Sequence, residues 1–151
     1  MTEHVYESDG IGMCELSAAE VEKVLSDNKN FVLATCANNR VTTRTMSHVH
    51  DGLTVYFQTG GQYLKTLQLA ENPNAALNMG EYDLEGVAEI IGHPLDDANR
   101  FFIEKLKAKH PNAFERWSSL PNQVVIKVEI RSARCWRYIN GKPVIATWHR
   151  A

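Results

Sequence analysis

The sequence predicts a mainly β protein of the α+β class, in which antiparallel strands close into a small barrel with flanking helices. About eight short runs have the alternating or continuously apolar pattern of strands. Neighbouring runs are joined by tight-turn signals such as Asn38-Asn39, Asp51-Gly52 and Asn140-Gly141, which favour antiparallel pairing. Three segments between the strand groups carry apolar residues at helical spacing. Closure is expected because it removes the exposed edges of a sheet.

The N-terminal region divides into an irregular stretch and a well-marked first helix. Residues 1–14 are polar and are predicted to be a flexible leader or an arm lying on a partner, and residues 15–151 a single domain. Ser17 and Glu20 match a capping box, in which the serine side chain caps the Glu20 N–H and the glutamate reaches back. Asp27-Asn28 ends this helix.

The remaining elements follow in chain order. We expect strands at 31–37, 41–49 and 53–59, a helix at 62–71, strands at 75–79 and 84–91, a helix at 94–110, a short turn from 111 to 117, and strands at 123–130, 133–139 and 142–148. Gly86 lies inside one of these strands, which indicates a bulge or a close approach of another backbone segment.

Three polar side chains around the second and third strands favour anion binding. Arg44 lies in the middle of a strand, Thr59 ends the next strand, and Lys65 follows Gly60-Gly61 in the first turn of a helix. A guanidinium, a hydroxyl, an ammonium and a helix N-terminus can converge on one phosphate group. Spacing alone leaves a second interpretation open, in which Arg44 is a surface strand residue and Lys65 a solvated helix lysine.

Five segments resemble a known family in their order and spacing, over roughly residues 15–140. They are VLAT at 32–35, RTMSHV at 44–49, VYFQT at 55–59, LKTLQLAENP at 64–73 and LEGVAEIIG at 84–92. The sequence resembles the pyridoxamine 5′-phosphate oxidase-like, FMN-binding split-barrel family, and most closely its general-stress-protein and nitroimidazole-reductase-like members. The resemblance implies an antiparallel split β-barrel that forms a homodimer, with cofactor sites between the subunits.

The resemblance also implies which residues bind the cofactor, FMN. It assigns the phosphate to Lys65, and a contact from the other subunit to Trp136. The implied cofactor-binding residues are Arg44, Thr45, Met46, Ser47, Gln58, Thr59, Lys65 and Trp136. An indole face suits a flavin ring, although a tryptophan that only fills the barrel is an equal alternative for Trp136. No catalytic side chain is implied, because FMN itself supplies the electron chemistry.

Two functions remain open. One is a flavin-dependent oxidoreductase that acts on an unidentified small molecule. The other is a non-catalytic stress or sensor protein that binds a flavin, the deazaflavin F420 or haem, for which His48 or His149 would be the axial ligand. Pyridoxamine 5′-phosphate oxidase activity itself is not expected. That branch has an arginine–histidine signature after the tryptophan, whereas this chain has RYINGKPVIATW, with Ala146 at the place of a further arginine.

Composition narrows these possibilities. The 151 residues are 44% hydrophobic and 23% charged, and the net charge of −2 argues against a general nucleic-acid binder. No apolar run approaches the length of a membrane span. The chain has three cysteines, no C-x-x-C motif and no signal peptide, which together favour a location in the cytoplasm.

His48 and His50 share a strand face, but no carboxylate or cysteine joins them at ligand spacing, so no metal site is expected.

Overall fold

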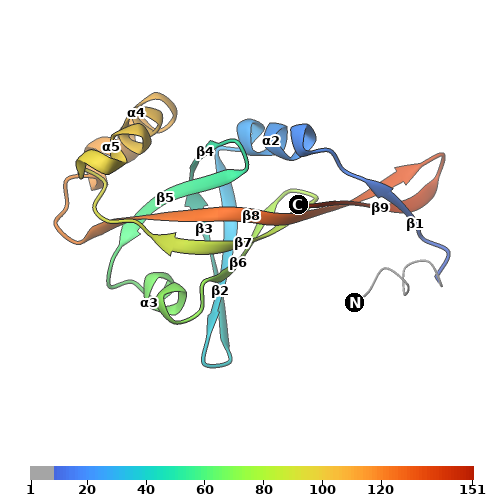
Figure 1. Ribbon diagram of the computed structural model, residues 1–151, viewed down its shortest axis with the longest axis horizontal. Helices are drawn as coiled ribbons and strands as arrows, with labels where there is room; N and C mark the ends of the chain where they lie inside the picture. The colour runs from blue at the N-terminus through green and yellow to red at the C-terminus, as the bar shows by residue number, and fades with distance from the viewer. Residues whose placement is uncertain (1–8) are drawn as a thin grey trace.

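In the computed structural model of the chain, residues 9–151 are described. Its elements are β1 (Gly12–Glu15), α2 (Ala18–Asp27), β2 (Asn30–Ala37), β3 (Arg40–Ser47), β4 (Val49–Asp51), β5 (Thr54–Gly60), α3 (Leu64–Glu71), β6 (Asn74–Met79), β7 (Tyr82–Ile90), the 3₁₀ turn η1 (Asp97–Asn99), α4 (Arg100–Lys109), α5 (Pro111–Trp117), β8 (Gln123–Ile139) and β9 (Lys142–His149). Helices α4 and α5 lie at one end of the long axis, and the β8–β9 hairpin with β1 lies at the other end (Figure 1).

The strands form one sheet in the order β1-β9-β8-β7-β6-β2-β3, and β5 pairs with both β8 and β4. Every pair is antiparallel except β1 with β9. The predicted fold class, an antiparallel split β-barrel with flanking helices, is confirmed. The expected closure is incomplete, because no hydrogen-bonded pair joins β3 to β4 or β5 within residues 9–151. The chain leaves the ladder at His48, so the predicted strand over 41–49 is two strands.

Strand β8 runs without interruption through 17 residues, where the sequence predicted two separate strands. Its pairing with β7 shifts by one residue between Glu85 and Gly86, which is the bulge that the glycine indicated. The backbone approach is also close, because a Cβ on Gly86 would lie 2.6 Å from the carbonyl oxygen of Glu129. The bulge lies at residues 131–132, where the sequence pattern is interrupted and where two separate strands were therefore predicted.

The predicted leader is wrong for its last residues. Gly12–Glu15 is strand β1, which pairs in parallel with β9 and thereby covers an edge that β9 would otherwise leave open. Residues 1–8 lie outside the described part of the chain. No helix within residues 9–151 is long and apolar enough to cross a membrane.

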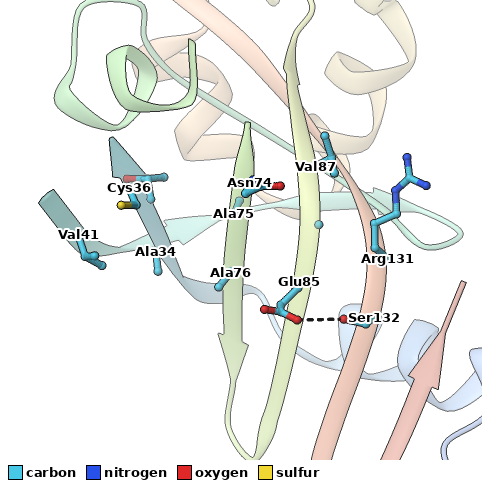
Figure 2. Close-up of a pocket in the computed structure, with 12 residues that line it drawn as sticks. Ala34, Cys36, Val41, Asn74, Ala75, Ala76, Glu85, Val87, Arg131 and Ser132 are labelled. Carbon is cyan, nitrogen blue, oxygen red and sulfur yellow. Dashed lines mark hydrogen bonds between the residues drawn. The ribbon is translucent and has the colours of Figure 1, made fainter. Parts of the chain in front are cut away.

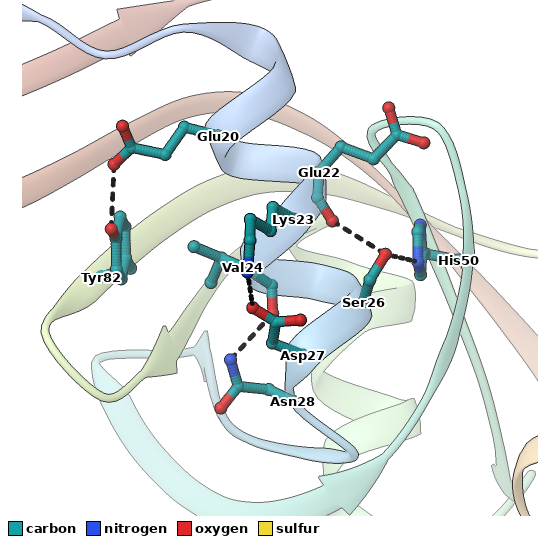
Figure 3. A network of polar contacts seen from close by, with 9 residues as sticks. All are labelled: Glu20, Glu22, Lys23, Val24, Ser26, Asp27, Asn28, His50 and Tyr82. Carbon is teal, nitrogen blue, oxygen red and sulfur yellow. Dashed lines mark hydrogen bonds and ion pairs between the residues drawn. The ribbon is translucent and has the colours of Figure 1, made fainter.

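The N-terminus of helix α2 is capped as the sequence predicted, but only in one direction. The N–H of Glu20 donates to Ser17 Oγ at 3.1 Å. The Glu20 carboxylate does not reach back to the cap. It accepts a hydrogen bond of 2.9 Å from the Tyr82 hydroxyl (Figure 3). It also forms an ion pair with Arg137. A cationic partner on β8 attracts the carboxylate more strongly than a backbone N–H does.

The other end of α2 is tied to the sheet through side chains (Figure 3). Asn28 Nδ2 donates to the Val24 carbonyl at 2.8 Å, which satisfies one of the last carbonyls of the helix. Ser26 Oγ donates to the Glu22 carbonyl at 3.2 Å and lies 3.0 Å from His50 Nε2 on β4. These bonds fix the direction in which the chain enters β2.

A second, smaller core forms beneath helix α4, between Val49 of β4 and Val125 of β8. The predicted helix over 94–110 becomes α helix only at Arg100, after the 3₁₀ turn. Pro111 does not open a simple turn as predicted but begins helix α5, where its missing N–H is harmless at the first helical position. Helices α4 and α5 therefore reach the end of the sheet where β5 and α3 meet.

Candidate functional site

A cavity of about 260 Å³ lies where β3, β5 and the start of α3 face helices α4 and α5. Its walls are formed by Thr45, Met46, Ser47, Gln58, Thr59, Gly60, Tyr63, Lys65, Leu106, Ala113, Trp117 and Gln123. Six of the eight residues that the sequence predicted as cofactor-binding are among them: Thr45, Met46, Ser47, Gln58, Thr59 and Lys65. The two predicted residues outside this lining are Arg44 and Trp136.

Two neighbouring cations mark one end of this site: Lys65 lines the cavity, and Arg44 lies outside the lining but close enough for its charge to act on Lys65. Lys65 Nζ donates to Thr59 Oγ1 at 3.1 Å. Burial lowers the pKa of Lys65, and the nearby positive charge of Arg44 lowers it further. Burial also lowers the pKa of Arg44. No carboxylate forms a salt bridge with either side chain within residues 9–151. Two half-buried, neighbouring cations without an acidic partner favour a bound anion.

The turn before α3 brings backbone close to this end. Gly60 lets the Tyr63 ring lie close to the backbone, since a Cβ on Gly60 would be 2.9 Å from the ring carbon Cε1 and the ring would have to shift. Thr66 Oγ1 donates to the Gly60 carbonyl at 2.7 Å and holds the turn against the helix. The N-cap residue of α3, Tyr63, makes no side-chain hydrogen bond to the first turn. The first N–H groups of α3 therefore remain available to an anion.

Gln58 has a structural task in addition to its place in the wall. Its Nε2 donates to the Ala113 carbonyl at 3.2 Å, and its Oε1 accepts from Ser118 Oγ at 2.8 Å. Both ends of the amide are thus used to hold α5 against β5. This places Trp117, on α5, in the cavity wall.

Sequence reasoning missed the part of the wall contributed by the two helices. Leu106, Ala113, Trp117 and Gln123 belong to no local motif and are more than 40 residues from Lys65 in the chain. Leu106, Ala113 and Trp117 reach the cavity because α4 and α5 pack across the end of β5, and Gln123 reaches it as the first residue of β8. No pattern within the sequence of these segments signals that contact.

Trp136 does not reach the cavity of its own chain. It belongs to the β8–β9 hairpin, and this hairpin lies at the end of the molecule opposite α4 and α5 (Figure 1). There Trp136 lines a hollow together with Glu81 and Arg137, among others. Its side chain is 44% exposed. A contact between Trp136 and a cofactor would therefore require a second copy of the chain.

The outer face of the sheet carries a wider hollow of about 460 Å³ that no sequence motif indicated (Figure 2). Its floor consists of small residues on neighbouring strands, among them Ala34 and Ala76, and Val41 and Val87 lie at its sides. Val41 is 67% exposed. An apolar strip of this kind across β3, β2, β6 and β7 is typical of a surface that contacts another protein.

The two histidines considered as axial ligands, His48 and His149, are outside the cavity lining. His48 is buried, and its Nε2 lies 2.7 Å from the Asn28 carbonyl oxygen. His149 lies near Trp148 in a separate hollow. Within residues 9–151, no three His, Cys, Asp or Glu side chains gather as metal ligands would. The described cavity lining contains no histidine.

Comparison with known proteins identifies the family. Residues 17–137 match the sequence pattern of the pyridoxamine 5′-phosphate oxidase family. The chain is also 31% identical to general stress protein 26 of Bacillus subtilis (strain 168) over 129 residues, which span 83% of this chain and 91% of that protein. The chain therefore belongs to the pyridoxamine 5′-phosphate oxidase family, as its motifs predicted.

Solved structures with the same fold include proteins that bind different cofactors. A FAD-binding protein from Mesorhizobium loti superposes with a TM-score of 0.62 and 16% identity, covering 78% of this chain and 92% of that chain. The haem storage protein HutZ from Vibrio cholerae superposes with a TM-score of 0.63 and 13% identity, covering 75% and 89%. At these identities the likeness shows the fold alone.

Proposed function

We propose that this protein binds FMN and acts as a flavin-dependent oxidoreductase on a small molecule. The observation that carries the proposal is the pair of neighbouring, half-buried cations Arg44 and Lys65, neither of which has an acidic partner in the described chain. Lys65 also donates to the Thr59 hydroxyl. FMN, when bound, would supply electron or hydride transfer. The single FMN-binding domain predicted over residues 15–151 would then also include β1, which begins at Gly12.

Lys65, Arg44 and the start of α3 would hold the phosphate. The ammonium and guanidinium groups donate charge-assisted hydrogen bonds, which are shorter and stronger than bonds between neutral groups. Thr59 Oγ1 already accepts from Lys65, so its proton can be donated to a phosphate oxygen. Burial lowers the pKa of both cations, and the charge of Arg44 lowers that of Lys65 further. A bound dianion would favour the charged form of both side chains and so oppose these shifts.

The apolar part of the cavity would receive the ring system. Met46, Leu106 and Trp117 offer the apolar and aromatic surface that a flavin ring needs. The cavity, at about 260 Å³, is smaller than the roughly 300–1,000 Å³ typical of cofactor sites. A second copy docked on the outer face near Val41 would enlarge it, and Trp136 of that copy would complete its wall. The proposed assembly is thus a homodimer with FMN between the subunits.

The alternative is a protein of the same fold that binds flavin, F420 or haem without catalysis. The relative that stores haem makes this a real competitor. Against haem stands the cavity lining of the described residues, which includes the cation Lys65, with Arg44 close behind it, but no imidazole. F420 carries a long polyanionic tail and would favour more basic residues than Lys65 and Arg44 alone. A cytoplasmic location and the absence of a nucleic-acid partner stay predictions from composition.

The absorption spectrum of the purified protein tests the proposal first, because flavin bands and a Soret band differ. Titration with FMN then tests the phosphate site. Replacing Arg44 by Gln and Lys65 by Met together should weaken FMN binding roughly 100-fold or more, since each removes a charge-assisted hydrogen bond of about 1.5–3 kcal/mol. Lys105→Met, at an exposed position on α4, is the matched control. Unchanged affinity in the double variant would exclude the phosphate site.

A further inference from the structure

A buried polar network lies directly beneath Arg44. Arg44 Nη1 donates to Thr35 Oγ1 at 2.7 Å and to the Leu33 carbonyl at 3.3 Å, and Nη2 donates to Thr42 Oγ1. Both threonine hydroxyls contact one atom of helix α3, Gln68 Oε1, at 2.5 Å from Thr35 and 2.7 Å from Thr42. Thr35 and Gln68 are almost completely buried, with exposed fractions of 2% and 4%.

The amide of Gln68 determines which way these hydroxyls point. Its Nε2 donates to the Arg40 carbonyl at 3.1 Å, which turns Oε1 toward the two threonines. An amide oxygen can only accept, so each hydroxyl must give its proton to Gln68. The lone pairs of Thr35 Oγ1 and Thr42 Oγ1 then face the guanidinium, which can only donate. Each group in the network therefore has one hydrogen-bonding role that its neighbours require.

The network holds a cation with neutral oxygens only. Two threonine hydroxyls and the Leu33 carbonyl orient the guanidinium without neutralising it. A carboxylate in the same place would form an ion pair with Arg44 and compete with any anionic ligand. The three bonds use Nη1 and one N–H of Nη2, which leaves Nε–H and the second N–H of Nη2 for a ligand.

We propose that Gln68 is a positioning residue for the anion site: through Thr35 and Thr42 it orients Arg44 toward a phosphate while leaving the guanidinium charge unpaired. This inference rests on the proposed function, because the phosphate is that of FMN. Gln68 touches neither the cavity nor the ligand, and it acts only by fixing the hydroxyls that Arg44 uses. Strand β2, strand β3 and helix α3 are thereby coupled at the one place where the phosphate binds.

The experiment compares binding of FMN with binding of riboflavin, which lacks the phosphate. Gln68→Met keeps the size of the side chain but removes the amide, and it should weaken FMN binding about tenfold, the equivalent of one hydrogen bond, with riboflavin binding unchanged. Thr35→Val should act in the same direction without altering α3. Leu67→Met, on the exposed face of the same helix, is the matched control. Equal losses for FMN and riboflavin would mean that Gln68 only stabilises the fold, and would overturn the inference.

A double-mutant cycle separates positioning from general packing. In an Arg44→Gln background, Gln68→Met should cause no further loss of FMN affinity, because the residue that it orients is gone. Additive losses would contradict the inference.

If the wild-type protein binds no FMN, the proposed function fails, and the orientation of Arg44 is then measured in the flavin-free protein. There the Arg44 Nε–Hε NMR signal should be sharp in wild type and shifted or broadened in Gln68→Met, and an unchanged signal would overturn the inference.

Discussion

Acid should destabilise this fold through one buried histidine. The His48 ring packs edge-on against Phe31 with a centroid separation of 5.4 Å, and the residue is fully buried. Its Nε2 lies 2.7 Å from the Asn28 carbonyl oxygen, so the neutral ring donates there. Its Nδ1 has no hydrogen-bond partner within residues 9–151. A proton on Nδ1 would therefore create a buried charge without an acceptor.

The size of the effect follows from the pKa of His48. Burial, and next the positive charge of Lys109, lower this pKa from 6.5 to about 4. Because the pKa is lower in the folded state, the unfolded state binds the proton first as pH falls. The contribution to stability is complete above about pH 6.5 and is lost between about pH 6.5 and pH 4. A difference of roughly 2.5 units, at about 1.4 kcal/mol each, amounts to about 3 kcal/mol.

Urea denaturation followed by circular dichroism measures this loss. Between about pH 7 and pH 4, the free energy of unfolding of wild type should fall about 3 kcal/mol further than that of His48→Gln, which keeps a donor for the Asn28 carbonyl but does not titrate. His110 also has a pKa lowered by burial, so only the difference between the two proteins is diagnostic. His149→Gln, at an exposed position, is the matched control and should follow wild type. Parallel curves for wild type and His48→Gln would refute the reasoning.

Two further predictions concern the bulge and helix α5. Gly86→Ala should lower the free energy of unfolding by about 2 kcal/mol or more, since the new Cβ would lie 2.6 Å from the Glu129 carbonyl oxygen. Gly12→Ala is the control and should change the free energy little, because its nearest contact is at 3.5 Å. Equal urea midpoints for the two variants would contradict this prediction. Ser118→Ala removes the 2.8 Å bond to Gln58, a loss of about 1 kcal/mol, and should speed amide hydrogen exchange in α5 by about fivefold while exchange in α2 stays the same. Protection equal to wild type would show that the bond does not hold the helix.

Some wrong boundaries show where local pattern ceases to be informative. The sequence indicated two strands across residues 123–139 because Arg131 and Ser132 interrupt the alternation. The structure has one strand, since β8 bulges opposite Glu85 and Gly86 of β7 and leaves Arg131 as the extra residue between Ile130 and Ser132. Likewise, Gly12–Glu15 looked irregular because a four-residue edge strand needs only a partner, not a hydrophobic pattern. In both places the partner strand, and not the local sequence pattern, determines whether the segment forms a strand.

Only part of the candidate site could be predicted from the sequence. Arg44, Thr59 and Lys65 could be predicted to lie together because a hairpin and a glycine turn connect them within about 20 residues. Whether Gln58 faces a ligand or a helix could not be predicted. Its amide is taken by Ala113 and Ser118, which come from a helix some 55 residues away.

The sequence by itself determined the succession of strands and helices, the family, and the cluster of cations, because turns, caps and side-chain period act over a few residues. Only the tertiary structure decided that the barrel is left open between β3 and β5, that α4 and α5 supply a wall of the cavity, and that Trp136 lies far from it in the same chain. It also decided that Gln68 meets Thr35 and Thr42. These contacts join segments distant in the chain, and they depend on shape and on the satisfaction of buried polar groups, which no short stretch of sequence encodes.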